Sequence, residues 1–128
     1  MRRRRRNGQL RTQAQAGFRD CPKSGPGQNL SNCDFSGVQF AGKSLRGANL
    51  SGALFEDANL CSADLRGANL QKTDFRFANL TRADFRGTNL AQANTTGALF
   101  CQTVLPSGKL DNSGCPEGPT ICCFNSQC

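Results

Sequence analysis

The sequence contains no histidine, tryptophan or tyrosine, and only one methionine. Without histidine the chain lacks the side chain that proteins use most often as a general base near neutral pH and as a metal ligand. Leu, Phe, Ile and Val together are also scarce, so the 128 residues have room for one domain with a modest core. No apolar run approaches about 18 residues, the length of a membrane-spanning helix, so none is expected.

The net charge of +7 is unevenly distributed along the chain. Residues 1–25 hold eight Lys or Arg and one Asp, whereas residues 26–110 hold eight Lys or Arg and six Asp or Glu. Residues 111–128 add two acidic residues and no basic one. The basic character therefore belongs to the N-terminal segment, and the body of the chain is nearly neutral.

Bulky apolar residues occupy every fifth position between residues 30 and 105. Fifteen of these sixteen positions are Leu or Phe, and Thr95 is the exception. The residue two places earlier is small in most units, and the residue between the two is usually Asn or Asp. A helix repeats its buried face every three to four residues and a strand every two, so this period fits neither. It predicts a chain that bends every five residues, with Asn, Asp and Gly at the bends, and coils around an axis.

A second period, of twenty residues, gives the number of sides in each coil. Phe35, Phe55 and Phe75 follow this period in the core positions. A twenty-residue period over a five-residue unit predicts four sides per coil. Successive coils should stack like strands, about 4.8 Å apart, which makes the fold all-β.

Units such as ANLSG, ADLRG, ANLQK and ADFRG resemble the A(D/N)LXX consensus of the pentapeptide-repeat family. The resemblance covers about residues 26–110 and implies the fold of that family, a right-handed quadrilateral β-helix, here of about four coils. Repeats of this kind stabilise their neighbours and need caps at both ends. We therefore expect a basic segment and cap lead-in at 1–25, the β-helix at 26–110 and an irregular cysteine-rich tail at 111–128.

Eight cysteines in so short a chain favour an oxidising compartment. Cys21 lies in the segment that leads into the repeats, and Cys33 occupies an inward small position, so we expect a disulfide between them at the first cap. Cys101 and Cys115 enclose the segment where the chain leaves the coil, and a bridge between them would pin the tail. Loops of this size contribute roughly 3 kcal/mol each in the chain-entropy model.

The remaining cysteines leave alternatives open. Cys61 and Cys101 share an outward-facing column but lie two coils apart, about 9.6 Å, beyond the roughly 7 Å Cα separation of a disulfide. The tail either forms a small disulfide knot or, with four thiolates, a tetrahedral zinc site. Adjacent cysteines make a poor chelate, so the knot is favoured and no cofactor is assigned. The tail cysteines are Cys115, Cys122, Cys123 and Cys128.

The run Arg2 to Arg6 opens a basic segment with few apolar residues. It resembles the first part of a signal peptide, but no apolar stretch follows, so no complete signal peptide is visible. One hypothesis is an arm that binds nucleic acid or an anionic surface with salt-sensitive affinity. The other is a start that is processed or misassigned.

Two features of the repeat body are candidate contact surfaces. Three arginines should stack on one side of the coil: Arg46, Arg66 and Arg86. Because Asp64 and Asp84 stand two residues before an arginine, this column is either a solvated, self-paired face or an anion-binding strip. Phe77 falls at an expected corner and should be an exposed aromatic contact point.

The favoured function is a non-enzymatic structural or protein-interaction module, a small rigid rod stabilised by disulfides outside the cytoplasm, in a secreted, periplasmic or lumenal setting. The family resemblance implies a second function, since some members mimic duplex DNA and bind DNA gyrase, a topoisomerase. A near-neutral body of four coils disfavours that role, which requires a longer acidic rod. An enzyme would have to work without histidine, on a flat surface. The sequence names no protein partner and no oligomeric state.

Overall fold

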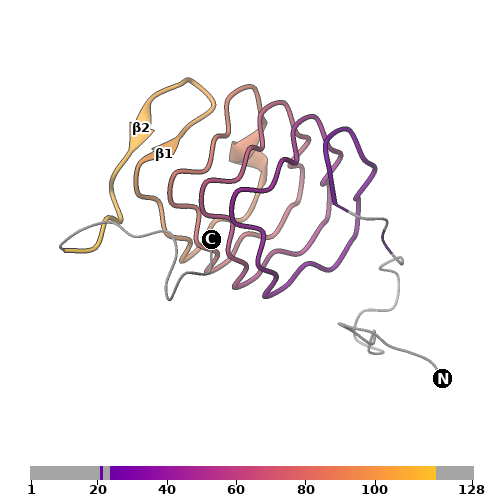
Figure 1. Ribbon diagram of the computed structural model, residues 1–128, viewed down its shortest axis with the longest axis horizontal. Helices are drawn as coiled ribbons and strands as arrows, with labels where there is room; N and C mark the ends of the chain where they lie inside the picture. The colour runs from indigo at the N-terminus through magenta and orange to yellow at the C-terminus, as the bar shows by residue number, and fades with distance from the viewer. Residues whose placement is uncertain (1–20, 22–23, 118–128) are drawn as a thin grey trace.

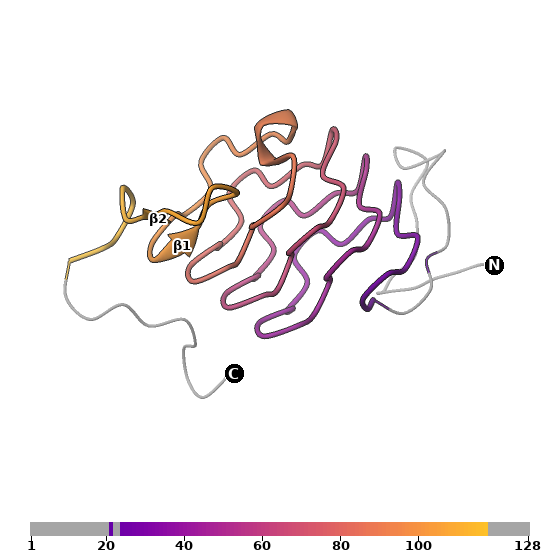
Figure 2. The ribbon, with the colours of Figure 1, turned by 90° about the horizontal axis from the view of Figure 1, so that it is seen from above.

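The structure is a computed structural model that describes Cys21 and residues 24–117. Figure 1 shows a stack of coils that runs from the indigo N-terminal part to the yellow C-terminal part. In Figure 2 the strands β1 (Thr103–Val104) and β2 (Leu110–Asp111) lie at the end of the stack opposite the indigo coil. The segment Arg2 to Arg6 and the cysteines Cys122, Cys123 and Cys128 lie outside the described residues.

Parallel pairing between residues twenty positions apart holds each side of the coil. The first pairs on sides one to four are Asn29↔Asn49, Asp34↔Leu54, Gln39↔Asn59 and Ser44↔Asp64. Backbone groups bond to the coils on both sides: the Leu50 N–H donates to the Asn69 carbonyl at 2.9 Å, and the Asn49 N–H donates to the Gln28 carbonyl at 2.9 Å. The predicted right-handed quadrilateral β-helix is confirmed.

A β-turn joins each side to the next. In the turn that follows Leu50, the Ala53 N–H donates to the Leu50 carbonyl at 2.9 Å, and Gly52 has a φ of 71°. Gly suits this third position because it adopts the left-handed region without a steric penalty. The side chain before the bulky residue completes the turn, since Asn49 Oδ1 accepts a hydrogen bond from the Ser51 N–H at 3.1 Å. In the units that have Asn or Asp at this position, the side chain therefore fixes the bend.

The core is a stack of large side chains separated by small ones. The central Leu and Phe of the middle coils are fully buried, and the rings of Phe35, Phe55 and Phe75 stack with centroids 5.1 and 5.4 Å apart. Thr73 takes a small inward position, where its hydroxyl donates to the Leu50 carbonyl at 2.8 Å. The buried hydroxyl is thus satisfied, as a polar group in a core must be.

The last coil departs from the regular pattern on side one. Here the Leu70 N–H bonds to the side-chain oxygen of Asn89 at 2.6 Å in place of a backbone carbonyl, and the 3-10 helix η2 (Leu90–Gln92) follows. Thr95, the exception in the five-residue pattern, is half-buried just after η2. The chain then forms β1 and returns as β2, antiparallel to it. No helix in the described part of the chain has the length and apolarity to span a bilayer.

Truncation of a stacked ring tests the core. Phe55→Ala should lower the free energy of unfolding by about 3–5 kcal/mol, and Phe55→Leu by about 1–2 kcal/mol, because Phe55 is fully buried between two rings. Denaturant unfolding with the disulfides intact measures both values. Leu110→Ala is the control, since Leu110 is 60% exposed and should change stability by less than about 0.5 kcal/mol. Equal losses at positions 55 and 110 would contradict this core.

Candidate interaction surfaces and disulfide-tied ends

A disulfide ties the entry segment to the first coil. Cys21 and Cys33 are bonded, with their Cα atoms 5.7 Å apart. Cys33 is fully buried at an inward position, and Cys21 packs against the core from outside the repeats. The structure therefore brings together the first cysteine pair that the sequence favours, and the bond holds the lead-in against the end of the core.

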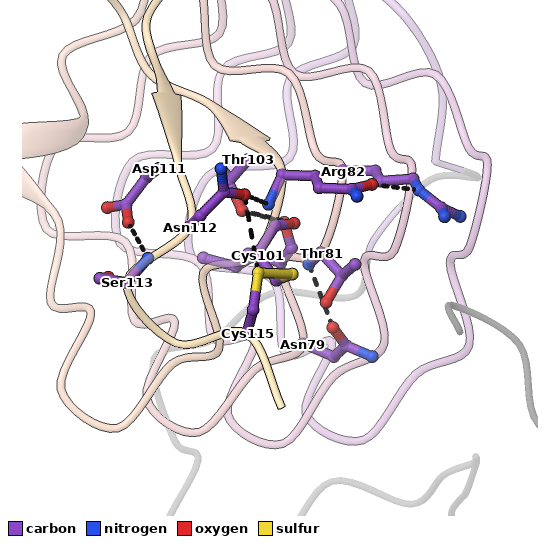
Figure 3. Close-up of a disulfide and its surroundings, with 11 residues drawn as sticks. Asn79, Thr81, Arg82, Cys101, Thr103, Asp111, Asn112, Ser113 and Cys115 are labelled. Atoms are coloured by element: carbon purple, nitrogen blue, oxygen red, sulfur yellow. Dashed lines mark hydrogen bonds between the residues drawn. A yellow bond between two sulfur atoms is a disulfide. The ribbon is translucent and has the colours of Figure 1, made fainter. Parts of the chain in front are cut away.

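A second disulfide closes the other end of the stack. Cys101, fully buried in the last coil, is bonded to the exposed Cys115, with Cα atoms 4.6 Å apart (Figure 3). Two hydrogen bonds fix the segment between them: the Gly114 N–H donates to the Phe100 carbonyl at 2.9 Å, and the Gln102 N–H donates to Asn112 Oδ1 at 2.7 Å. Cys115 thus belongs to the C-terminal cap, which leaves it unavailable for a zinc site in the tail.

Cys61 has a role that the sequence analysis did not assign. It is disulfide-bonded and fully buried, although its column faces outward, and Thr81 in the same column is also buried. The excluded Cys61–Cys101 bridge is indeed absent, because Cys101 is bonded to Cys115. The other four described cysteines are paired with one another, as Cys21–Cys33 and Cys101–Cys115. The sequence did contain a hint that Cys61 is bonded. Once Cys115 is paired with Cys101, three cysteines remain in the tail, and an odd number cannot pair completely among themselves.

The arginine column is largely paired with its own aspartates. Arg66 bonds both carboxylate oxygens of Asp64, Nε to Oδ1 at 2.9 Å and Nη2 to Oδ2 at 2.8 Å. Arg86 binds Asp84 in the same way, and Arg66 Nε also lies 3.9 Å from Asp84 Oδ2. Arg46 differs, because Ser44 stands where the later coils have an aspartate. The charge of the column is therefore neutralised except at its first member.

A second ion-pair group, on side two, escaped the sequence analysis. Arg76 Nη2 lies 2.8 Å from Asp74 Oδ2 and 3.5 Å from Glu56 Oε1 in the preceding coil. The sequence could have predicted this ion pair, because the stretch TDFRF at residues 73–77 has the same Asp-x-Arg spacing as the arginine column. The hydrogen bonds from its arginine hold the pKa of Asp74 below the ordinary value, and Arg66 and Arg86 do the same for Asp64 and Asp84.

Phe77 lies at the corner between sides two and three and is 56% exposed. Its φ of 59° places a bulky residue in the left-handed region, where the other coils have Gly37, Asp57 and Gly97. The ring lies against Gly97, since a Cβ added there would be 2.5 Å from it. The arginine column follows side four, at the diagonally opposite corner. The structure therefore separates the predicted contact residues into two surfaces.

Among the residues that the structure describes, no three side chains form a metal-binding group. The hypothesis of a zinc site in the tail rests on cysteines outside that part of the chain.

The paired aspartates predict a specific acid sensitivity. Folding lowers the pKa of each of these aspartates below the ordinary value of 3.8. At acid pH the unfolded chain therefore binds more protons than the folded chain does. The stability that the ion pairs contribute is fully present above pH 3.8 and is lost as the pH falls through the folded pKa. The midpoint of thermal unfolding should fall between about pH 5 and pH 2. The fall should be smaller in a triple Asp64→Asn, Asp74→Asn, Asp84→Asn variant.

Asparagine is a matched replacement, because Asn49 and Asn59 hold the same turn through the same side-chain oxygen. An identical acid response in both proteins would show that the ion pairs do not stabilise the fold.

The family model for pentapeptide repeats matches residues 29–67, 44–82 and 83–113, with eight copies. The chain is similar to the solved structure of alr5209, a pentapeptide repeat protein from Nostoc PCC 7120: the identity is 36%, the TM-score 0.53, and the match covers 55% of this chain and 58% of that one. It is also similar to the solved structure of HetL, a pentapeptide repeat protein involved in heterocyst differentiation regulation from Nostoc sp. strain PCC 7120. Here the identity is 32%, the TM-score is 0.39, and the match covers 64% of this chain and 40% of HetL. The chain thus spans less than two thirds of either protein, and no curated protein matches it. With the family model matching most of its length, the chain belongs to the pentapeptide repeat family.

Proposed function

We propose that the protein is a non-enzymatic protein-interaction module that works outside the cytoplasm. The observation that carries this proposal is the pair of disulfides at the two ends of the coil stack, Cys21–Cys33 and Cys101–Cys115. Structural disulfides persist in oxidising compartments such as the periplasm, an organelle lumen or the extracellular medium. Both bonds reach a buried cysteine of the coil, so each joins an end segment directly to the rod.

The sides of the rod favour recognition over catalysis. Three aspartates on these sides are each held by an arginine through two or more hydrogen bonds: Asp64 by Arg66, Asp74 by Arg76 and Asp84 by Arg86. A carboxylate held in this way is stabilised in its charged form and is a poor proton donor near neutral pH. The same pairing disfavours DNA mimicry, which needs an uncompensated acidic surface.

We assign the protein contact to the corner of Phe77. A bulky residue in the left-handed region costs about 1–2 kcal/mol, and a glycine would avoid this cost, as it does at Gly37 and Gly97. Phe77 nevertheless remains more than half exposed, so the packing of its ring offsets only part of this free-energy cost. Other described turns also place a non-glycine residue at positive φ, but those residues are polar or charged, and Phe77 is the one apolar side chain among them. An exposed aromatic ring in such a conformation is a reason to look for a function. The ring, next to the Arg76–Glu56 pair, offers an apolar centre with a charged rim.

The state of the thiols tests the compartment. Protein isolated from its native source, with thiols trapped during lysis, should show no alkylation before reduction and eight alkylated cysteines after it. Intact mass spectrometry distinguishes the two states. Eight free thiols in freshly isolated protein would contradict a role outside the cytoplasm, whatever surface the protein uses.

Replacement of Phe77 tests the contact surface. Phe77→Gly should change the free energy of unfolding by less than about 1 kcal/mol, because relief of the backbone strain offsets the lost contact with Gly97. A photoreactive phenylalanine analogue at position 77 should crosslink a protein in an extract of the native source. Denaturant unfolding and gel analysis measure the two effects.

The control places the same analogue at position 71, because Gln71 is an exposed turn residue at a different corner. Equal crosslinking at positions 71 and 77, or strong destabilisation by Phe77→Gly, would contradict a contact role for Phe77.

A further inference from the structure

The strand β2 forms the outer margin of side four. Val104 in β1 pairs in parallel with Asp84 of the preceding coil and antiparallel with Leu110 of β2. Figure 1 shows β2 beyond β1, at the far end of the stack. Among the described residues, side four is therefore a small sheet whose last strand has one neighbour and one open edge. Such an edge is a template for pairing with another strand.

The hydrogen-bond pattern shows which groups line that edge. The Val104 N–H donates to the Ala83 carbonyl at 2.9 Å, and the Val104 carbonyl accepts from the Phe85 N–H at 2.8 Å. Both groups of Val104 thus point to the preceding coil, away from β2. In an antiparallel pair, opposite residues either exchange both hydrogen bonds or exchange none. Val104 and Leu110 exchange none, so the N–H and carbonyl of Leu110 point out of the open edge.

The residue at this edge is exposed in both its backbone and its side chain. The Leu110 side chain is 60% exposed, and within the described part of the chain no hydrogen bond to its N–H or carbonyl is found. Val104, directly opposite in β1, is only half-buried and presents its side chain on the same face. The edge therefore combines an unpaired donor and acceptor with a short apolar row.

The charges that flank Leu110 determine what fits this edge. Lys109 precedes it and Asp111 follows it. Asp111 accepts the Ser113 N–H on Oδ1 at 2.8 Å, which leaves Oδ2 available (Figure 3). If a second β2 approaches antiparallel with Leu110 opposite Leu110, each Lys109 lies opposite the partner's Asp111. The segment Lys-Leu-Asp is thus complementary to itself in antiparallel register.

We infer that two copies of the chain associate end to end by antiparallel pairing of their β2 strands about a twofold axis at Leu110. The Leu110 N–H of each copy donates to the Leu110 carbonyl of the other, and the two leucines join Val104 of both copies in one apolar row. The contact is isologous, so it closes at two copies. It is independent of the proposed partner contact, because Phe77 lies between sides two and three.

The small size of this contact sets its strength. One strand segment per copy is far less than the roughly 1,600 Å² that a standard stable interface buries. The dimer should therefore be weak and in fast exchange with the monomer, with a dissociation constant on the order of 100 μM to 1 mM. Association should be visible only when the protein is concentrated or held at high local concentration.

Charge reversal with rescue provides the test. Sedimentation velocity of the oxidised protein from about 10 μM to 1 mM should show concentration-dependent dimers. Lys109→Asp, which places two aspartates opposite each other, should weaken association by about tenfold or more. Asp111→Lys alone should do the same. The double variant Lys109→Asp, Asp111→Lys restores opposite charges across the axis and should regain most of the association.

Two controls isolate the contact. Lys72→Asp reverses an exposed lysine in a turn far from β2 and should leave association unchanged, as should Phe77→Gly. Leu110→Ser should weaken association without lowering the thermal midpoint. A wild-type protein that is monomeric up to about 1 mM would overturn the inference, and so would a double variant as weak as either single variant. Neither result would bear on the disulfides or on binding at Phe77.

Discussion

The register of twenty residues between hydrogen-bonded neighbours is the constraint on which the rest of this structure depends. Each side contributes only a short stretch of extended backbone, so no side is stable alone, and each coil is held by the coils before and after it. The register survives only if every bend takes up the same number of residues. This is why Asn49 and its equivalents, which hold the turns through their side-chain oxygens, are as necessary to the fold as the buried leucines.

The same constraint explains how the ends and the surface are built. A stack stabilised by nearest neighbours is weakest at its first and last coils, where one neighbour is missing. The two described disulfides are placed there, and each uses a cysteine that is fully buried in a terminal coil, Cys33 or Cys101. Along the sides, stacking puts like residues next to each other, so a column of arginines would repel itself. The aspartates two residues earlier remove that repulsion at Arg66 and Arg86.

The sequence was most informative where the structure is periodic. The stack of Phe35, Phe55 and Phe75, and the four sides, follow from spacing alone, because the periods of the sequence are the periods of the coil. The η2 turn was not predictable, since it depends on Asn89 replacing a backbone carbonyl with its side chain. The bonding of Cys61 and the separation of Phe77 from the arginines depend on three-dimensional position. The open edge of β2 depends on an antiparallel return that the five-residue pattern does not encode.

Amide hydrogen exchange of the oxidised and the reduced protein tests the central claim most directly, namely that the register holds the middle of the rod and the disulfides hold its ends. In the oxidised protein the amides that bond between coils, such as those of Leu50 and Leu65, should exchange slowest. Reduction should release the amides of the terminal coils, near Cys33 and Cys101, while the middle coils keep their protection. Uniform loss of protection along the chain on reduction, or unchanged protection at both ends, would contradict the account.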